Sequence, residues 1–165
     1  MAADRQEVVK AILVAWITRN YDRIFPYLAD KVVYKVGAGA AKSICHSPGV
    51  FDGKDKVRLW YDSHTWMLTM YGEAAVNPFC GFVGPPQVVV YEDPAQNTVI
   101  AVGTVGLGVP HELPCEWMST WRFEGDLVVQ MTLVADSVGG LDQFAQARQK
   151  VIAEVQAATL SGLKP

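Results

Sequence analysis

The segment from Cys115 to Asp136 constrains the fold of this chain most strongly, because its pattern is that of a β-hairpin. Its first arm, Cys115 to Phe123, is rich in aromatic and other strand-favouring residues, and its second arm, Leu127 to Ala135, is almost continuously apolar. Gly125 lies between the arms, where its freedom to adopt a positive φ suits a tight turn. The sequence therefore predicts two long antiparallel strands, the second of which ends on a carboxylate.

The register of this hairpin decides which side chains share a face, and the sequence leaves it open. Side chains alternate across a strand, so each arm has an odd-numbered and an even-numbered face. A two-residue turn would pair the odd-numbered aromatic residues of the first arm with the even-numbered residues from Gln130 to Asp136. A three-residue turn would pair Glu116, Met118 and Thr120 with them instead. In either register one face carries a few polar groups among apolar ones, as a ligand pocket requires.

The composition favours a single apolar domain and argues against several kinds of partner. A length of 165 residues is that of one domain, and we expect one domain over residues 1–165. Hydrophobic residues make up 50% and charged residues 19%, which predicts an internal cavity, an oligomer interface, or both. The net charge of −3, without a basic cluster, argues against nucleic acid and anionic membranes. No apolar run approaches the ~18 residues of a membrane-spanning helix, so we expect no membrane insertion.

The N-terminus and the cysteines indicate a cytoplasmic protein. Residues 1–7 are polar and acidic, unlike a secretory signal. Cys45, Cys80 and Cys115 are odd in number and far apart, which favours reduced thiols over disulfides or a metal site. The three histidines are scattered, and there is no phosphate-binding loop or metalloprotease motif. We therefore expect neither a metal nor a cofactor.

The hydrophobic pattern places helices before most of the strands. It predicts helices over residues 4–20, 21–28, 53–65 and 141–160, and strands over 31–36, 87–91 and 98–107 in addition to the hairpin. Residues 66–70 either continue the third helix or leave it, and the role of the C-terminal helix is open. Residues 37–50 read as a long loop, which suggests a lid or a mobile edge. This grouping predicts an α+β fold, a curved sheet with helices on one face.

Three motifs together resemble a known fold family. Tyr21-Asp22 and Tyr27-Leu28-Ala29-Asp30 precede the first strand, Phe51-Asp52-Gly53-Lys54-Asp55-Lys56-Val57 opens the third helix, and Trp121-Arg122-Phe123-Glu124-Gly125-Asp126-Leu127 precedes the closing carboxylate. In order and spacing they resemble the nuclear-transport-factor-2-like fold, and within it SnoaL-like cyclases, limonene epoxide hydrolase and fungal terpenoid isomerases and cyclases. The resemblance implies a cone-shaped curved antiparallel or mixed sheet, packed against N-terminal helices and with an additional C-terminal helix, around an apolar pocket.

The resemblance also implies which residues face the pocket, and it favours the even-numbered face of the hairpin as the lining. The expected substrate-binding residues are Trp60, Leu68, Met70, Met118, Gln130, Thr132 and Val134.

Four further residues are candidates for catalysis. His64 has a side chain whose ordinary pKa of about 6.5 suits proton transfer at neutral pH. Burial in the pocket would raise the pKa of Glu116 and make it a usable acid or base. Tyr34 would orient a substrate oxygen, and Asp136 would handle a proton at the end of its strand. The alternatives are structural: a solvated His64 or Glu116, a helix cap by Asp136, and a core hydrogen bond by Tyr34.

Two well-known chemistries of this fold lack their residues here. The resemblance to limonene epoxide hydrolase would require an Asp–Arg–Asp set with a Tyr and an Asn, of which only Tyr34 is present. Val36 stands at the Asn position, residues 103–105 lack the Arg and Asp, and Thr132 replaces the last Asp. A ketosteroid isomerase would need a Tyr near Ile12 and a base near Val36, and both positions are apolar.

The expected function is therefore that of a cofactor-independent cyclase or isomerase. Its substrate would be an apolar terpenoid or polyketide intermediate, transformed by acid–base or shape-driven pericyclic catalysis in an enclosed pocket. The alternatives are an epoxide hydrolase-like enzyme and a non-catalytic module that binds a hydrophobic ligand or dimerises. A homodimer is expected because members of the family commonly pair through the outer face of the sheet.

Overall fold

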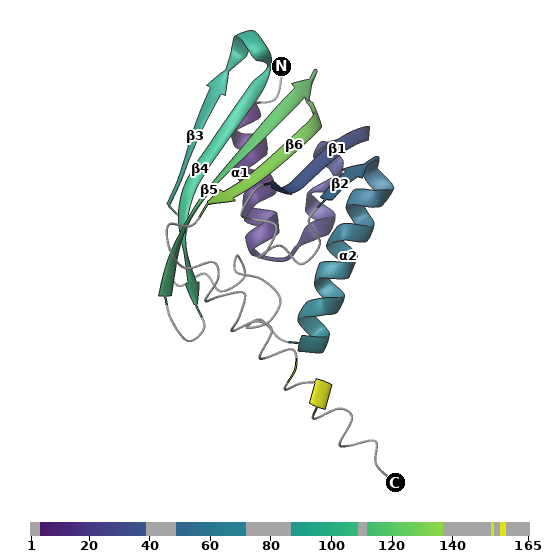
Figure 1. Cartoon of the computed structure of the whole chain (residues 1–165). Helices are drawn as coiled ribbons and strands as arrows, with labels where there is room; N and C mark the ends of the chain where they lie inside the picture. Colours follow the sequence, from purple (N-terminus) through teal and green to yellow (C-terminus); the bar gives the residue numbers. More distant parts are fainter. Residues whose placement is uncertain are drawn as a thin grey trace.

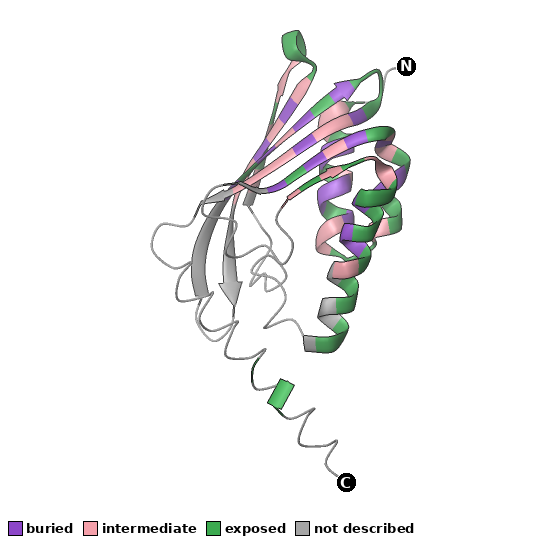
Figure 2. Cartoon of the chain, turned by 45° about the vertical axis from the view of Figure 1, so that its right-hand side comes forward, coloured by how far each residue is buried: buried purple, intermediate pink, exposed green. Residues whose placement is uncertain are grey.

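The computed structural model describes residues 4–38, 49–71, 87–108 and 112–136, together with Ala153, Gln156 and Ala157. Within these ranges a six-stranded sheet bends over helices that lie on one of its faces, as Figures 1 and 2 show, which confirms the α+β class. The elements are α1 (Arg5–Ile17), η1 (Tyr21–Arg23), η2 (Phe25–Tyr27), β1 (Leu28–Ala38), β2 (Gly49–Asp52), α2 (Lys54–Tyr71), β3 (Gln87–Asp93), η4 (Pro94–Gln96), β4 (Thr98–Gly108), β5 (Glu112–Glu124) and β6 (Leu127–Asp136). The predicted helix over residues 141–160 lies outside the described residues apart from those three positions.

The helices follow the predicted pattern with one correction. Asp4 caps α1 by accepting hydrogen bonds from the backbone N–H groups of Gln6 (3.0 Å) and Glu7 (3.4 Å). The third predicted helix forms as α2 and continues through residues 66–70 to Tyr71. The predicted helix over residues 21–28 is wrong, because the chain forms two short 3₁₀ helices there. Pro26 explains the break, since proline lacks the N–H group that a continuous helix would use.

The sheet is mixed, and its strands follow the order β2-β1-β6-β5-β4-β3. Strands β1 and β6 pair in parallel, while the other neighbours pair antiparallel. The prediction of a loop through Val50 is wrong at both of its ends. Strand β1 runs on to Ala38, and Gly49–Asp52 pairs with β1 as β2, with Val36 opposite Gly49. Four residues carry too short a pattern to signal a strand, so only the pairing with β1 reveals it.

The hairpin combines features of both registers that the sequence allows. Its turn has two residues, because Glu124 pairs with Leu127 across Gly125 and Asp126. An irregularity between Arg122 and Phe123 then shifts the register by one residue, so that Thr120 lies opposite Thr132. The resulting pairs are those expected for a three-residue turn. The bulge therefore decides which side chains of β5 and β6 share a face.

The hydrophobic core lies between the sheet and the helices, where Figure 2 shows the buried residues gathering. Helix α1 contributes apolar residues such as Val9 and Ile12, and α2 contributes Val57 and Trp60. From the sheet side, strand β5 completes the core with Trp117, Trp121 and Phe123. Among the described residues, no helix combines the length and the apolar character needed to cross a membrane.

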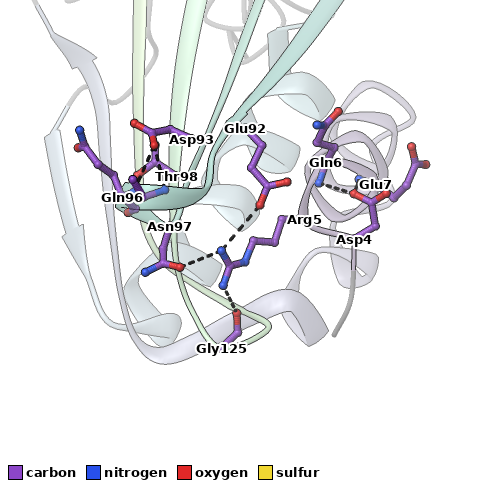
Figure 3. A network of polar contacts seen from close by, with 11 residues as sticks. Asp4, Arg5, Gln6, Glu7, Glu92, Asp93, Gln96, Asn97, Thr98 and Gly125 are labelled. Atoms are coloured by element: carbon purple, nitrogen blue, oxygen red, sulfur yellow. Dashed lines mark hydrogen bonds and ion pairs between the residues drawn. The ribbon is translucent and has the colours of Figure 1, made fainter. Parts of the chain in front are cut away.

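A polar cluster ties the beginning of α1 to two turns of the sheet (Figure 3). The guanidinium group of Arg5 donates hydrogen bonds to Asn97 Oδ1 (2.9 Å) and to the carbonyl oxygen of Gly125 (3.3 Å). It also lies 3.8 Å from a carboxylate oxygen of Glu92 and 5.6 Å from the centre of the Phe123 ring. One side chain thus fixes the helix against the β3–β4 and β5–β6 connections.

Candidate functional site

An apolar cavity lies between the helices and the concave face of the sheet. Its volume is about 30 Å³, above the ~10–15 Å³ that one water molecule needs, and it is only partly enclosed. Four tryptophans and one tyrosine dominate its wall. The lining residues are Ile12, Leu13, Trp16, Trp60, Tyr61, Trp117, Ser119, Trp121, Met131 and Leu133.

Local periodicity explains how distant segments contribute to this wall. Ile12 and Trp16 are four residues apart and therefore lie on one face of α1, while Trp60 and Tyr61 come from α2. Alternation along β5 places its odd-numbered residues on the same side of the sheet. On β6, Met131 and Leu133 lie opposite Trp121 and Ser119. The cavity thus depends on the register of the hairpin.

Ser119 provides a buried hydroxyl group in this otherwise apolar wall. Its side chain is 1% exposed. The indole Nε1–H of Trp121 donates a hydrogen bond to Ser119 Oγ at 2.8 Å. A polar group buried in such surroundings needs a partner to offset its loss of hydration, and the indole supplies one. The pair therefore holds a hydroxyl group in a defined position at the cavity wall.

Three tyrosines form a second polar cluster beside the cavity. The rings of Tyr21 and Tyr61 stack with their centroids 4.7 Å apart, and Tyr34 meets Tyr61 edge-on at 6.2 Å. The Tyr34 hydroxyl is buried without a partner in good hydrogen-bond geometry among the described residues, and the Tyr61 hydroxyl is the polar group that interacts with it. This cluster contains a catalytic candidate, Tyr34, and a lining residue, Tyr61.

Burial keeps these phenols neutral. It raises the pKa of Tyr34 well above the ordinary value, and the hydrogen-bonding influence of Tyr61 offsets only part of this effect. Burial also raises the pKa of Tyr61, and the neighbouring Tyr34 and Tyr21 hydroxyls raise it further. Both groups therefore keep their protons at neutral pH. Tyr61, which lines the cavity, can therefore donate a hydrogen bond to a ligand oxygen, and neither phenol can act as a base at neutral pH.

The structure brings only some of the predicted site residues to the cavity. Trp60 lines it, and Tyr34 is fully buried behind Tyr61 without lining it. Met70 is 50% and Met118 is 41% exposed. Gln130, Thr132 and Val134 are partly buried and belong to the even-numbered face. The sequence predicted that the even-numbered face lines the pocket. The cavity is instead bordered by the odd-numbered face, so this expectation is corrected for that cavity.

The side chains of the other candidates lie outside what the structure describes. His64 and Leu68 are backbone positions within α2. Glu116 lies opposite Asp136 across β5 and β6, in the same even-numbered series of positions as Met118. The catalytic roles of His64, Glu116 and Asp136, and the binding role of Leu68, stay predictions.

Several lining residues were not among the sequence-based candidates. Tyr61 and Trp16 lie on helix faces whose apolar character is visible in the sequence, but a tyrosine or tryptophan there is more often part of a core. Ser119 carries a clearer signal, since it is the polar position among the aromatic residues of its face. Only the register shows that this face borders the cavity.

No protein-family model and no curated protein matches this chain in sequence. Solved structures do match in fold. TerC, crystallised with polyporic acid, aligns with a TM-score of 0.61 and 15% identity over 87% of this chain and 99% of its own. A Bacillus subtilis protein assigned provisionally as an isomerase gives 0.59 and 13% over 88% and 94%. An NTF2-like protein of unknown function from Burkholderia pseudomallei gives 0.58 and 15% over 88% and 97%. The chain therefore has the NTF2-like fold that its motifs indicate.

Proposed function

We propose that this protein is a cofactor-independent cyclase or isomerase that acts on an apolar terpenoid or polyketide intermediate. The observation that carries the proposal is the cavity, in which four tryptophans surround Ser119 and Tyr61, the lining residues with hydroxyl groups. The enclosed volume is smaller than a whole substrate of this kind, so only part of an apolar, oxygen-poor ring system would lie against this wall, with the remainder at the open side of the cavity. Two structures of this fold give support, because one is provisionally an isomerase and the other, TerC, was crystallised with polyporic acid.

Catalysis would rest on confinement and on neutral hydrogen-bond donors. Rigid aromatic walls hold a flexible substrate in one reactive conformer, which can lower the barrier by several kcal/mol. The Tyr61 phenol is protonated at neutral pH, so it could donate a hydrogen bond to negative charge that develops on a carbonyl oxygen. Any proton removal would fall to His64, Glu116 or Asp136, the candidates that the sequence offers.

The test begins with substrate identification. The purified protein would be incubated with the products of the enzymes encoded beside its gene, and new cyclic or isomeric products would be detected by mass spectrometry and NMR. With a substrate in hand, Tyr61→Phe should lower kcat by about 10² if the phenol stabilises an oxyanion. Tyr91→Phe, which alters an exposed phenol, is the matched control. A kcat unchanged by Tyr61→Phe would contradict the oxyanion role.

The acid–base and shape-driven mechanisms separate by mutation. If the acid–base mechanism holds, at least one of His64→Ala, Glu116→Gln and Asp136→Asn abolishes turnover. If all three retain it, shape-driven catalysis remains. Incorporation of labelled solvent oxygen into the product would instead indicate epoxide hydrolysis.

Carriage of a hydrophobic ligand is the second candidate function. The described lining residues favour it. They include no carboxylate, histidine or lysine, and the one tyrosine among them is neutral at neutral pH. Tight binding of the intermediates without any turnover would support it over catalysis.

A further inference from the structure

The Ser119 hydroxyl has a hydrogen-bonding capacity that the described residues do not use. A hydroxyl group can donate one hydrogen bond and accept two. Ser119 Oγ accepts from Trp121 Nε1 at 2.8 Å, and among the described residues nothing accepts its proton. Leaving tyrosine and tryptophan aside, Ser119 is the residue with a polar side chain that is buried in the described part of the chain. A buried donor without an acceptor is unfavourable, so its presence in this position calls for an explanation.

The surroundings of Ser119 leave the cavity as the place where this acceptor would lie. Ser119 is flanked along β5 by Trp117 and Trp121, and it lies opposite Ala101 on β4 and Leu133 on β6. These neighbours offer no side-chain acceptor. Ser119 itself lines the cavity, whose volume of about 30 Å³ accommodates one oxygen-bearing group.

We propose that the Ser119 hydroxyl donates a hydrogen bond to a carbonyl or hydroxyl oxygen of the bound ligand. Trp121 is the positioning residue, because its N–H occupies one acceptor site of Ser119 Oγ and so restricts where the proton can point. Hydrogen bonds in such a chain polarise and strengthen one another. The inference rests on the proposed function, in that the cavity receives the oxygen-bearing part of the ligand. It specifies an oxygenated apolar molecule and predicts discrimination against the corresponding hydrocarbon.

Two probes of nearly the same shape test this inference. Acetophenone carries a carbonyl oxygen where α-methylstyrene carries a methylene group. Each would be titrated by NMR into wild type, Ser119→Ala and Thr120→Ala, with the indole N–H signals as the readout. Thr120→Ala is the matched control, because it removes a hydroxyl group from the adjacent position on the opposite face of β5.

Ser119→Ala should weaken acetophenone binding by about fivefold, the factor expected for one net hydrogen bond, and leave α-methylstyrene binding nearly unchanged. Thr120→Ala should leave both unchanged. The Trp121 indole signal should shift in Ser119→Ala without ligand, because its acceptor is lost, while the other signals show that the variant is folded.

The outcomes distinguish this inference from the proposed function. Equal weakening of both probes would show that Ser119 acts by packing alone, and weakening of neither would show that it does not contribute to binding. Either result overturns the inference while the cavity remains the binding site. Wild-type protein that binds neither probe would overturn the assignment of the cavity as the ligand site, and with it both proposals.

Discussion

Replacement of Tyr34 by phenylalanine should stabilise this protein, although Tyr34 is a core residue. The side chain is 0% exposed, and its hydroxyl has no partner in good hydrogen-bond geometry among the described residues. The ring itself packs edge-on against Tyr61 at 6.2 Å and Trp121 at 6.3 Å. Phenylalanine keeps these ring contacts and removes only the oxygen, so the substitution isolates the effect of the hydroxyl.

The magnitude follows from two opposing terms. An unsatisfied buried hydroxyl costs about 1–3 kcal/mol, whereas its interaction with the Tyr61 hydroxyl contributes at most about 1 kcal/mol. Tyr34→Phe should therefore raise the free energy of unfolding by about 1 kcal/mol, which corresponds to a rise in Tm of roughly 2–4 °C for a chain of this length. If the hydroxyl also supports Tyr61 in turnover, activity should fall as stability rises.

Urea denaturation followed by far-UV circular dichroism measures the effect directly. Tyr91→Phe serves as the control, since Tyr91 is 58% exposed and its substitution should change the free energy of unfolding by less than about 0.5 kcal/mol. Destabilisation by Tyr34→Phe of more than about 1 kcal/mol would mean that the hydroxyl makes a strong hydrogen bond, and would refute the reasoning.

Three further predictions follow from the same structure. Burial raises the pKa values of Tyr34 and Tyr61, so in a spectrophotometric titration two of the six tyrosines should ionise only as the protein unfolds. Their stabilising contribution is complete below about pH 10, the ordinary tyrosine pKa, and is lost as pH rises above it; six normal titrations in the native protein would contradict this. Arg5→Ala should lower the free energy of unfolding by about 1 kcal/mol. Lys10→Ala, which removes only an exposed ion pair, should lower it less, and equal effects of the two substitutions would show that the Arg5 cluster adds no stability. We also propose a homodimer through the even-numbered sheet face, so wild type should sediment as a dimer at micromolar concentration and Met118→Glu as a monomer, because the new charge would be buried at the interface. A monomeric wild type would exclude this arrangement.

Local sequence signals predicted much of the fold correctly. The first predicted helix forms as α1, whose cap at Asp4 involves only residues of its first turn. The turn at Gly125 likewise depends on adjacent residues, and its positive φ of 59° is the conformation that glycine adopts freely. The order of the three motifs was enough to indicate the NTF2-like fold. These features could be predicted because the residues that produce each of them are close together in the chain.

The sequence by itself thus determined most of the element types and their bounds, the fold and the apolar character of the interior. Only the tertiary structure decided the pairing of β2 with β1, the bulge beside Phe123 and the face of β5 that borders the cavity. Register depends on hydrogen bonds between segments far apart in the chain, and a shift of one residue reverses every side chain of a strand. For the same reason, the position of the Ser119 hydroxyl at the cavity and the raised pKa of Tyr61 follow only from the packing of the sheet against the helices.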